Sequence, residues 1–225
     1  MAERRQPDPE RVPLNRERVL LAAIDLADES GVDSLTMRAL ADRLGVQAMS
    51  LYNHVGNKDD LLDGMLDLVV GEIELPDAAD WREAVRGRAV SAHDVFSRHP
   101  WASALNDSRE SSGPARLRYF EWMVGTLRRA GFSLRLTTSA LSVLDSYVYG
   151  FGRQELNVST DGATPEEMAQ AFRQALPPDE YPYLTEMVEH ALAHGLDQKA
   201  EFDFGLEIIL DGLERARDSS ASATD

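Results

Sequence analysis

The sequence contains no cysteine among its 225 residues. Disulfide bonds, thiolate metal sites and cysteine nucleophiles are therefore excluded, and the absence fits a cytoplasmic protein. No apolar run approaches the about 18 residues that a membrane-spanning helix needs. The N-terminus, from Met1 to Pro7, lacks the apolar core of a secretory signal. We therefore expect a cytoplasmic chain without a membrane partner.

Basic residues are scarce, and their distribution is uneven. The chain has 23 Lys and Arg against 39 Asp and Glu, a formal net charge of −16. Residues 1–58 hold 8 basic and 9 acidic residues, a net charge of −1, so the remaining residues carry −15. This asymmetry favours one end that faces nucleic acid and a larger part whose acidic surface keeps it in solution.

Helical periodicity accounts for the whole chain. No stretch shows the sustained alternation of a β-strand, so the expected fold class is all-α. We expect a flexible arm at residues 1–14, a polar loop at 157–164 and a disordered tail at 218–225. The helices are expected over residues 16–30, 36–44, 47–54, 58–69, 81–98, 114–130, 133–152, 165–176, 181–194 and 200–217.

The stretch from Leu35 to Val55 predicts two short helices separated by one glycine. Leu40 and Leu44 share a face of the first because they are four residues apart. Gly45 follows, where a residue with positive φ ends a helix at little cost. The second helix would expose a small, polar and aromatic face without an acid, which suits the DNA major groove. The residues of that face are Gln47, Ala48, Ser50, Tyr52, Asn53 and His54. The stretch therefore predicts a helix-turn-helix whose second helix reads DNA.

Residues from about Arg16 to Leu68 resemble the DNA-binding domain of the tetracycline-repressor family. The matching residues are Ala22-Ala23, Leu26-Ala27, Gly31, Leu35-Thr36, Arg38, Leu40-Ala41, Leu44-Gly45-Val46, Ser50-Leu51-Tyr52, His54-Val55, Asn57-Lys58 and Leu61-Leu62. The resemblance implies an N-terminal three-helix helix-turn-helix domain at residues 15–70 and a larger helical ligand-binding and dimerisation domain at 76–217. It implies a homodimeric transcriptional repressor that an unknown small-molecule effector releases from a palindromic double-stranded DNA operator.

The resemblance also assigns roles to single residues of the helix-turn-helix. Arg38 would contact a base or a phosphate, since a guanidinium donates two hydrogen bonds to either; the alternative is a solvated helix arginine. Tyr52 and Lys58 match phosphate contacts, and Lys58 lies where a helix N-terminus also favours an anion. Asn53 occupies a position where relatives often carry a bulkier aromatic residue, and Met49 one where some carry proline. The operator sequence therefore stays open.

The rest of the chain resembles the tetracycline-repressor-type subgroup more loosely. The matching segments are Asp80-Trp81-Arg82, His99-Pro100-Trp101, Gly131-Phe132-Ser133 and the run from Phe202 to Leu213. The implied dimer is a bundle of the 133–152 and 200–217 helices from both subunits. Gly205 and Gly212 lie two turns apart on one face and would allow close helix approach; the alternative is a contact within one chain.

A pocket between helices of the larger domain would be mostly apolar with a few placed polar groups. Each aromatic or methionine candidate could equally belong to the core. The candidates are Phe96, Trp101, Tyr119, Trp122, Met123, Tyr147, Phe151 and Met187. His190 and His194 have the spacing of metal ligands, but no third ligand is identifiable, so we predict no metal and no cofactor.

Two other function classes compete with a regulator. A small all-helical enzyme would need a nucleophile or an acid–base pair, and Ser, His and Asp occur without a recognisable arrangement. A helical protein-interaction module would use the helix-turn-helix for protein contact. The enzyme hypothesis does not explain the acid-free reader face, and we predict a DNA-binding regulator that is not an enzyme. Salt-dependent binding to duplex DNA separates it from both alternatives.

Overall fold

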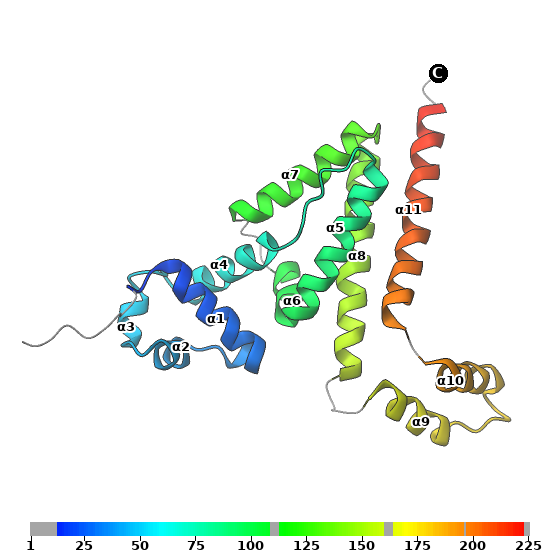
Figure 1. The fold of residues 1–225 in the computed structure, drawn as a ribbon, viewed down its shortest axis with the longest axis horizontal. Helices are drawn as coiled ribbons and strands as arrows, with labels where there is room; N and C mark the ends of the chain where they lie inside the picture. The colour runs from blue at the N-terminus through cyan, green and yellow to red at the C-terminus, as the bar shows by residue number, and fades with distance from the viewer. Residues whose placement is uncertain (1–12, 109–112, 160–163, 196, 223–225) are drawn as a thin grey trace, which may run out of the picture.

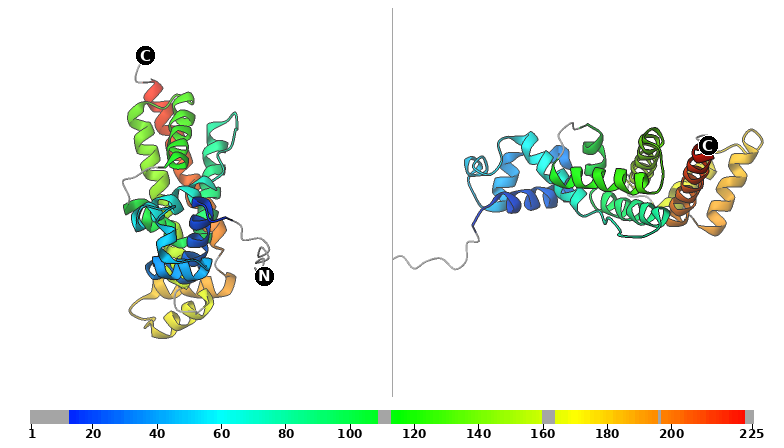
Figure 2. Two further views of the ribbon diagram at one scale, coloured as in Figure 1. Left: turned by 90° about the vertical axis from the view of Figure 1, so that its left-hand side faces the viewer. Right: turned by 90° about the horizontal axis from the view of Figure 1, so that it is seen from above.

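The computed structural model describes residues 13–108, 113–159, 164–195 and 197–222, and within these ranges all regular structure is helical. This confirms the all-α fold class. The arm predicted at residues 1–14 lies almost entirely outside the described residues. Figures 1 and 2 show an elongated molecule, with the N-terminal helices at one end and α9 and α10 at the other.

The first five elements form a compact N-terminal unit. They are α1 (Arg16–Ser30), the 3-10 turn η1 (Val32–Ser34), α2 (Met37–Leu44), α3 (Ala48–Leu51) and α4 (Lys58–Gly71). Side chains cap three of the helices: Asn15 accepts from Arg18 N, Thr36 from Ala39 N and Asn57 from Asp60 N. Each cap satisfies a backbone N–H that the helix leaves unpaired, which fixes where each helix begins.

A small apolar core holds these helices together. The fully buried side chains are Val19, Ala23, Leu35, Leu40, Leu51, Leu61, Met65, Leu66 and Val69. Burying one leucine or methionine contributes about 1.5–3 kcal/mol, so a few such residues position the short α2 and α3 against α1 and α4.

The larger part is a helical bundle continuous with the N-terminal unit. Its helices are α5 (Trp81–Arg98), α6 (Pro100–Ser108), α7 (Pro114–Arg129), α8 (Leu134–Ser159), α9 (Pro165–Ala175), α10 (Pro182–His194) and α11 (Gln198–Ser222). α8 packs on α5, α6, α7 and α11, while α4 packs on α7, α6 and α5. α4 thus belongs to both parts.

The hairpin of α9 and α10 extends away from this bundle. Figure 1 shows both helices beyond the ends of α8 and α11. They pack mainly on each other, and α9 makes a smaller contact with α8.

The main differences from the sequence prediction concern four helices. α6 was not predicted, because Pro100 was interpreted only as a stop for α5; proline is also favoured at the first position of a new helix. α8 runs to Ser159, past the predicted end at residue 152 and over the first three residues of the polar loop expected at 157–164. α11 runs to Ser222, and the hydroxyls of Ser219 and Ser220 donate to carbonyls four residues earlier. Residues 218–222 are therefore helical, and the tail prediction was wrong there.

The fourth difference is the length of the reader helix. α3 covers only Ala48–Leu51, whereas the sequence predicted residues 47–54. Asn53 N and His54 N donate to carbonyls three residues earlier, at 3.4 and 2.9 Å. The predicted helix therefore ends in tighter turns of the 3-10 kind.

Candidate nucleic-acid interface and effector cavity

The turn between α2 and α3 is fixed by backbone geometry. Gly45 has φ 65° and ψ 34°, the left-handed conformation that glycine adopts without strain. Its N–H and that of Val46 donate to the last carbonyls of α2. Leu51 and Val55 are buried on the inner side of the next segment. These contacts hold α3 across α2 with one face outward.

The predicted reader residues lie on this outward face. Arg38, Gln47, Tyr52, Asn53 and Lys58 are exposed, and the other three, Ala48, Ser50 and His54, are half-buried. No acid occurs in α3 or the turns up to Val55. The surface is therefore free of the carboxylates that phosphate would repel.

Met49 also lies on this face, although the sequence interpretation did not count it among the reader residues. Its side chain is 74% exposed on α3, between Ala48 and Ser50. An exposed methionine next to reader positions offers an apolar contact for a thymine methyl group. Met49 lies two residues before the buried Leu51, which places the two side chains on opposite sides of a helix. This spacing could have identified Met49 as an exposed residue of the face.

The two arginines of α2 differ in their partners. Arg43 donates twice to Glu29 of α1, at 2.6 Å each, so its role is structural. Arg38 makes no ion pair or side-chain hydrogen bond with the residues that the structure describes. Its guanidinium is therefore available for a base edge or a phosphate, which need its paired donors.

Arg16 holds the far side of the reader turn. It donates to the His54 carbonyl at 3.0 Å and to both carboxylate oxygens of Asp60, at 2.8 and 2.6 Å. Asp60 also accepts from Gly56 N at 2.8 Å. The hydrogen bonds from Arg16 and then from Gly56 lower the pKa of Asp60 to about 2. This ion pair ties the start of α1 to the start of α4 and to the end of the reader segment.

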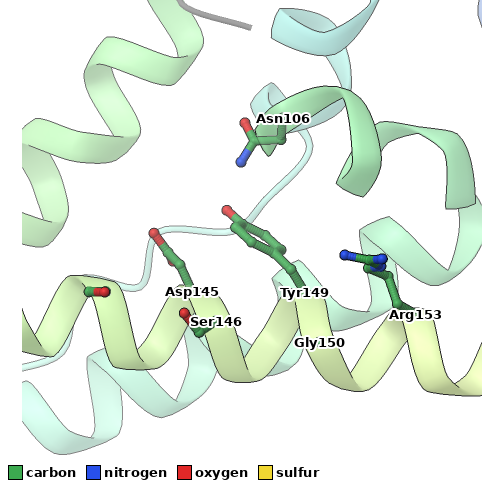
Figure 3. Close-up of a pocket in the computed structure, with 7 residues that line it drawn as sticks. Asn106, Asp145, Ser146, Tyr149, Gly150 and Arg153 are labelled. Atoms are coloured by element: carbon green, nitrogen blue, oxygen red, sulfur yellow. The ribbon is translucent and has the colours of Figure 1, made fainter. Parts of the chain in front are cut away.

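A polar cavity of about 430 Å³ lies between α6 and α8. Figure 3 shows Asn106 facing α8, with the Tyr149 ring rising toward it. The lining residues are Asn106 of α6 and Ser142, Asp145, Ser146, Tyr149, Gly150 and Arg153 of α8.

The base of the cavity carries an ion pair whose arginine is fully buried. Arg88 of α5 is fully buried and donates to Asp145 Oδ1, which also accepts from the Tyr119 hydroxyl at 3.1 Å. The Arg88 guanidinium lies 4.5 Å from the centre of the Tyr119 ring. Among the described residues, Nε and Nη1 of Arg88 have no hydrogen-bond partner. Such a pair holds Asp145 in one orientation and favours polar ligands in the cavity.

None of the eight pocket candidates lines this cavity. Two of them contact residues that do. Tyr119 and Phe96 lie behind the lining, since Tyr119 binds Asp145 and the Phe96 ring packs on Tyr149 at 5.0 Å. Met123 is core, and Trp122 lines a separate cavity of about 360 Å³ beside residues 76–81. The remaining candidates are placed elsewhere: Trp101 at the start of α6, Tyr147 and Phe151 against Phe202 of α11, and Met187 exposed on α10.

The lining that the sequence interpretation missed has a recognisable pattern. Ser142, Asp145, Ser146, Tyr149 and Arg153 recur at three- and four-residue spacing, which places them on one face of α8. A polar stripe of this kind on a long helix with another, apolar face could have indicated the α8 wall of the cavity, but not its closure by α6.

Gly205 packs against Tyr147 of its own chain, as in the alternative of a contact within one chain. A Cβ there would collide with the Tyr147 hydroxyl, which donates to the Phe202 carbonyl at 2.8 Å. Gly212 differs, because a Cβ there meets no described atom within 4 Å. The two glycines therefore have separate roles.

The two histidines of α10 that have metal-ligand spacing, His190 and His194, stack on each other. No group of three or more potential metal ligands occurs in the part of the chain that is described. Within the same part, no helix is long and apolar enough to cross a membrane.

Comparisons with known proteins cover both parts of the chain. Residues 19–65 match the profile of bacterial regulatory proteins of the tetR family, and residues 75–217 match the tetracyclin repressor-like C-terminal domain. The chain is 35% identical over 212 residues to the HTH-type transcriptional repressor DrrR1 of Streptomyces coeruleorubidus, covering 89% of this chain and 77% of that protein. It is 30% identical over 207 residues to the class A tetracycline repressor from transposon 1721 of Escherichia coli, covering 88% and 90%.

Solved structures agree with these matches. Apo ActR from Streptomyces coelicolor has a TM-score of 0.77 at 28% identity, covering 94% of this chain and 100% of that one. ActR in complex with actinorhodin has a TM-score of 0.76 at 29% identity, covering 92% and 99%. A single-residue variant of TetR from Acinetobacter baumannii, in complex with minocycline, has a TM-score of 0.68 at 26% identity, covering 91% and 99%.

Proposed function

The chain belongs to the tetR family of bacterial regulatory proteins, and from that premise we propose a homodimeric repressor that a small molecule in the α6–α8 cavity releases from a palindromic operator. It is a DNA-binding transcriptional regulator. The proposal assigns DNA binding to residues 15–70 and ligand binding and dimerisation to residues 76–217.

The observation that carries the proposal is the outward face of α3 and its surroundings. Gln47, Ser50 and Asn53 supply short hydrogen-bonding groups, and Arg38 supplies an unengaged guanidinium beside them. The major groove admits an α-helix, and each base pair presents its own pattern of donors and acceptors there. Tyr52 and Lys58 flank the face and would fix the register on phosphates.

The dimer is supported by apolar side chains left exposed on α8 and α11. Phe204 is 67% exposed and Ile208 is 55% exposed on α11, and Val143 of α8 is exposed as well. Together with the open space beside Gly212, they favour a second copy of the same surface across a two-fold axis. Two reader helices related by that axis would match a palindromic site.

The effector site is supported by the α6–α8 cavity and by two relatives. ActR is described with actinorhodin and the Acinetobacter repressor with minocycline, so small molecules bind proteins of similar fold. Release requires that the effector bind the DNA-free conformer more tightly than the DNA-bound one.

The test is selection of duplexes from a random pool by the purified protein, followed by footprinting. We expect two-fold symmetric protection, with affinity that falls steeply as salt rises because bound phosphates release counterions. Actinorhodin and minocycline are the first probes for release. A protein that enriches no duplex sequence at low salt would refute the proposal.

A further inference from the structure

The polar stripe of α8 that lines the α6–α8 cavity carries two charged groups of opposite sign. Asp145 and Arg153 are eight residues apart, which is about 12 Å along the helix axis. Figure 3 shows both side chains on the side of α8 that faces Asn106, with Tyr149 between them. A ligand that lies along the stripe therefore meets an acidic group at one end and a basic group at the other.

The charge of Asp145 is already balanced from inside the protein. The fully buried Arg88 donates to Asp145 Oδ1, and the Tyr119 hydroxyl donates to the same oxygen. Nε and Nη1 of Arg88 have no hydrogen-bond partner among the described residues, so no second carboxylate shares this guanidinium. A cation bound beside Asp145 would therefore lie close to a buried positive charge, and their repulsion is strong where the dielectric constant is low.

The second carboxylate oxygen of Asp145 remains open to a ligand. Within the described part of the chain, both hydrogen bonds to this carboxylate end on Oδ1, and the side chain is 19% exposed. A carboxylate oxygen only accepts hydrogen bonds, so Oδ2 selects a donor. Because Arg88 disfavours a charged donor, a neutral hydroxyl is the group that fits.

The charge of Arg153 has no such balance. Its exposed side chain lines the cavity and forms no ion pair or side-chain hydrogen bond with any residue that the structure describes. A guanidinium presents paired donors that match the two oxygens of a carboxylate. Since Arg88 and Asp145 offset each other, Arg153 gives the cavity an excess positive charge in a chain whose formal net charge is −16. This local excess favours an acidic ligand.

The middle of the stripe leaves room for the body of such a ligand. Gly150 lines the cavity, and a Cβ at this position would meet no described atom within 4 Å. The neighbouring lining residues Ser142 and Ser146 have short side chains. The Tyr149 ring stands between the two charged groups and offers an apolar surface for a flat aromatic body.

We propose that the cavity takes an aromatic hydroxy acid, whose carboxylate pairs with Arg153 and whose hydroxyl donates to Asp145 Oδ2. The proposal rests on the effector site proposed above and names the chemical class of its ligand. The buried Arg88 decides the sign of the preference, because it converts Asp145 from a site for a cation into an acceptor for a neutral donor. The order of affinity is therefore acid, then neutral amide, then amine.

The test uses four probes built on one naphthalene body. They are a naphthoic acid with a hydroxyl on the far ring, its carboxamide, the corresponding aminomethyl compound, and the naphthoic acid without the hydroxyl. Binding to the whole chain is measured by titration calorimetry without DNA. We expect the hydroxy acid to bind about three- to tenfold more tightly than its amide and than the acid without the hydroxyl, and the amine to bind more weakly than the amide. Added salt should reduce the difference between acid and amide.

Reversal of the charge at Arg153 tests the acidic end of the ligand. Arg153→Glu should reverse the order, so that the amine binds more tightly than the acid, while Arg153→Lys should keep the order of the parent. Arg135→Glu is the matched control, because Arg135 is also exposed on α8 and the substitution makes the same change in net charge. It should leave the order unchanged.

Two glycines of α8 locate the bound probe. Gly150 lines the cavity and Gly152 does not, and a Cβ at either position would meet no described atom within 4 Å. Leucine is favoured over glycine in a helix, so neither substitution weakens α8 itself. Gly150→Leu should abolish binding of the hydroxy acid because the new side chain fills the middle of the stripe, whereas Gly152→Leu should bind it as the parent does.

The inference is overturned if the hydroxy acid does not bind, if it binds no more tightly than its amide, or if Arg153→Glu keeps the order of the parent. It is also overturned if Gly150→Leu binds the acid as the parent does, because the probe would then lie elsewhere. Binding is measured without DNA, so a chain that takes the acid but enriches no duplex would refute the proposed function and leave this inference standing.

Discussion

At the scale of single residues, Arg38 and Arg43 show how partners separate a binding role from a structural one. Arg38→Ala should lower operator affinity and leave thermal unfolding unchanged, because this side chain has no ion pair in the described structure. Loss of a bidentate base contact costs about 1–3 kcal/mol of discrimination. Arg43→Ala is the control, since it breaks the pair with Glu29 and should leave operator affinity close to the parent value. A lower melting temperature for Arg38→Ala, with unaltered DNA binding, would show that Arg38 is structural.

Met49 is the reader residue best suited to an apolar base contact. Replacing thymine by deoxyuridine removes only the C5 methyl group, so each thymine of the selected operator can be tested in turn. We expect one position per half-site at which the replacement weakens binding of the parent but not of Met49→Ala. Equal sensitivity of both proteins at every thymine would exclude this role.

Asp60 makes the reader turn sensitive to acid. Its pKa lies at about 2 in the folded chain, below the ordinary 3.8, because Arg16 and Gly56 hydrogen-bond to the carboxylate. The stabilisation is therefore complete above pH 3.8 and is lost as the pH falls toward 2. Asp60→Asn should lower the melting temperature at neutral pH and reduce its fall between pH 4 and pH 2. A parallel pH dependence in the two proteins would contradict this account.

At the scale of elements, two glycines of α11 allow subunit stability and dimer formation to be tested separately. Gly205→Leu should lower the thermal stability of the subunit, because the added side chain displaces Tyr147 from the Phe202 carbonyl. Overpacking of this kind costs typically about 1–3 kcal/mol. Gly212→Leu should preserve the melting of the fold and weaken self-association in sedimentation experiments, because its Cβ points into open space. The reverse assignment of the two effects would contradict the proposed interface.

Helix boundaries show how much of the fold can be predicted from local sequence. Asn15, Thr36 and Asn57 identify helix starts because a cap depends on residues within one turn. The α6 helix escaped prediction because Pro100 both ends α5 and begins the next helix. The full lengths of α8 and α11 escaped prediction as well, since serine and asparagine are equally common in loops and their helical state is decided by context.

At the scale of the whole molecule, the outward face of α3 could be predicted and the cavity could not. The residues of the reader are consecutive in sequence, so their pattern on a helix can be derived from spacing alone. The cavity forms only where Asn106 of α6 approaches the polar stripe of α8, and no local pattern signals that approach. The aromatic candidates Tyr147 and Phe151 were misplaced for the same reason. Both pack between α8 and α11, and composition alone cannot distinguish a core residue from a pocket residue.

The central claim is that two copies of the chain read one two-fold symmetric duplex. Its most direct test is competition binding of the purified protein to the selected operator, to the same duplex with one half-site scrambled, and to random duplex. Because paired half-sites act through one dimer, we expect the single half-site to bind far more weakly than the operator and close to random duplex. Equal affinity for the intact operator and the single half-site would contradict the account.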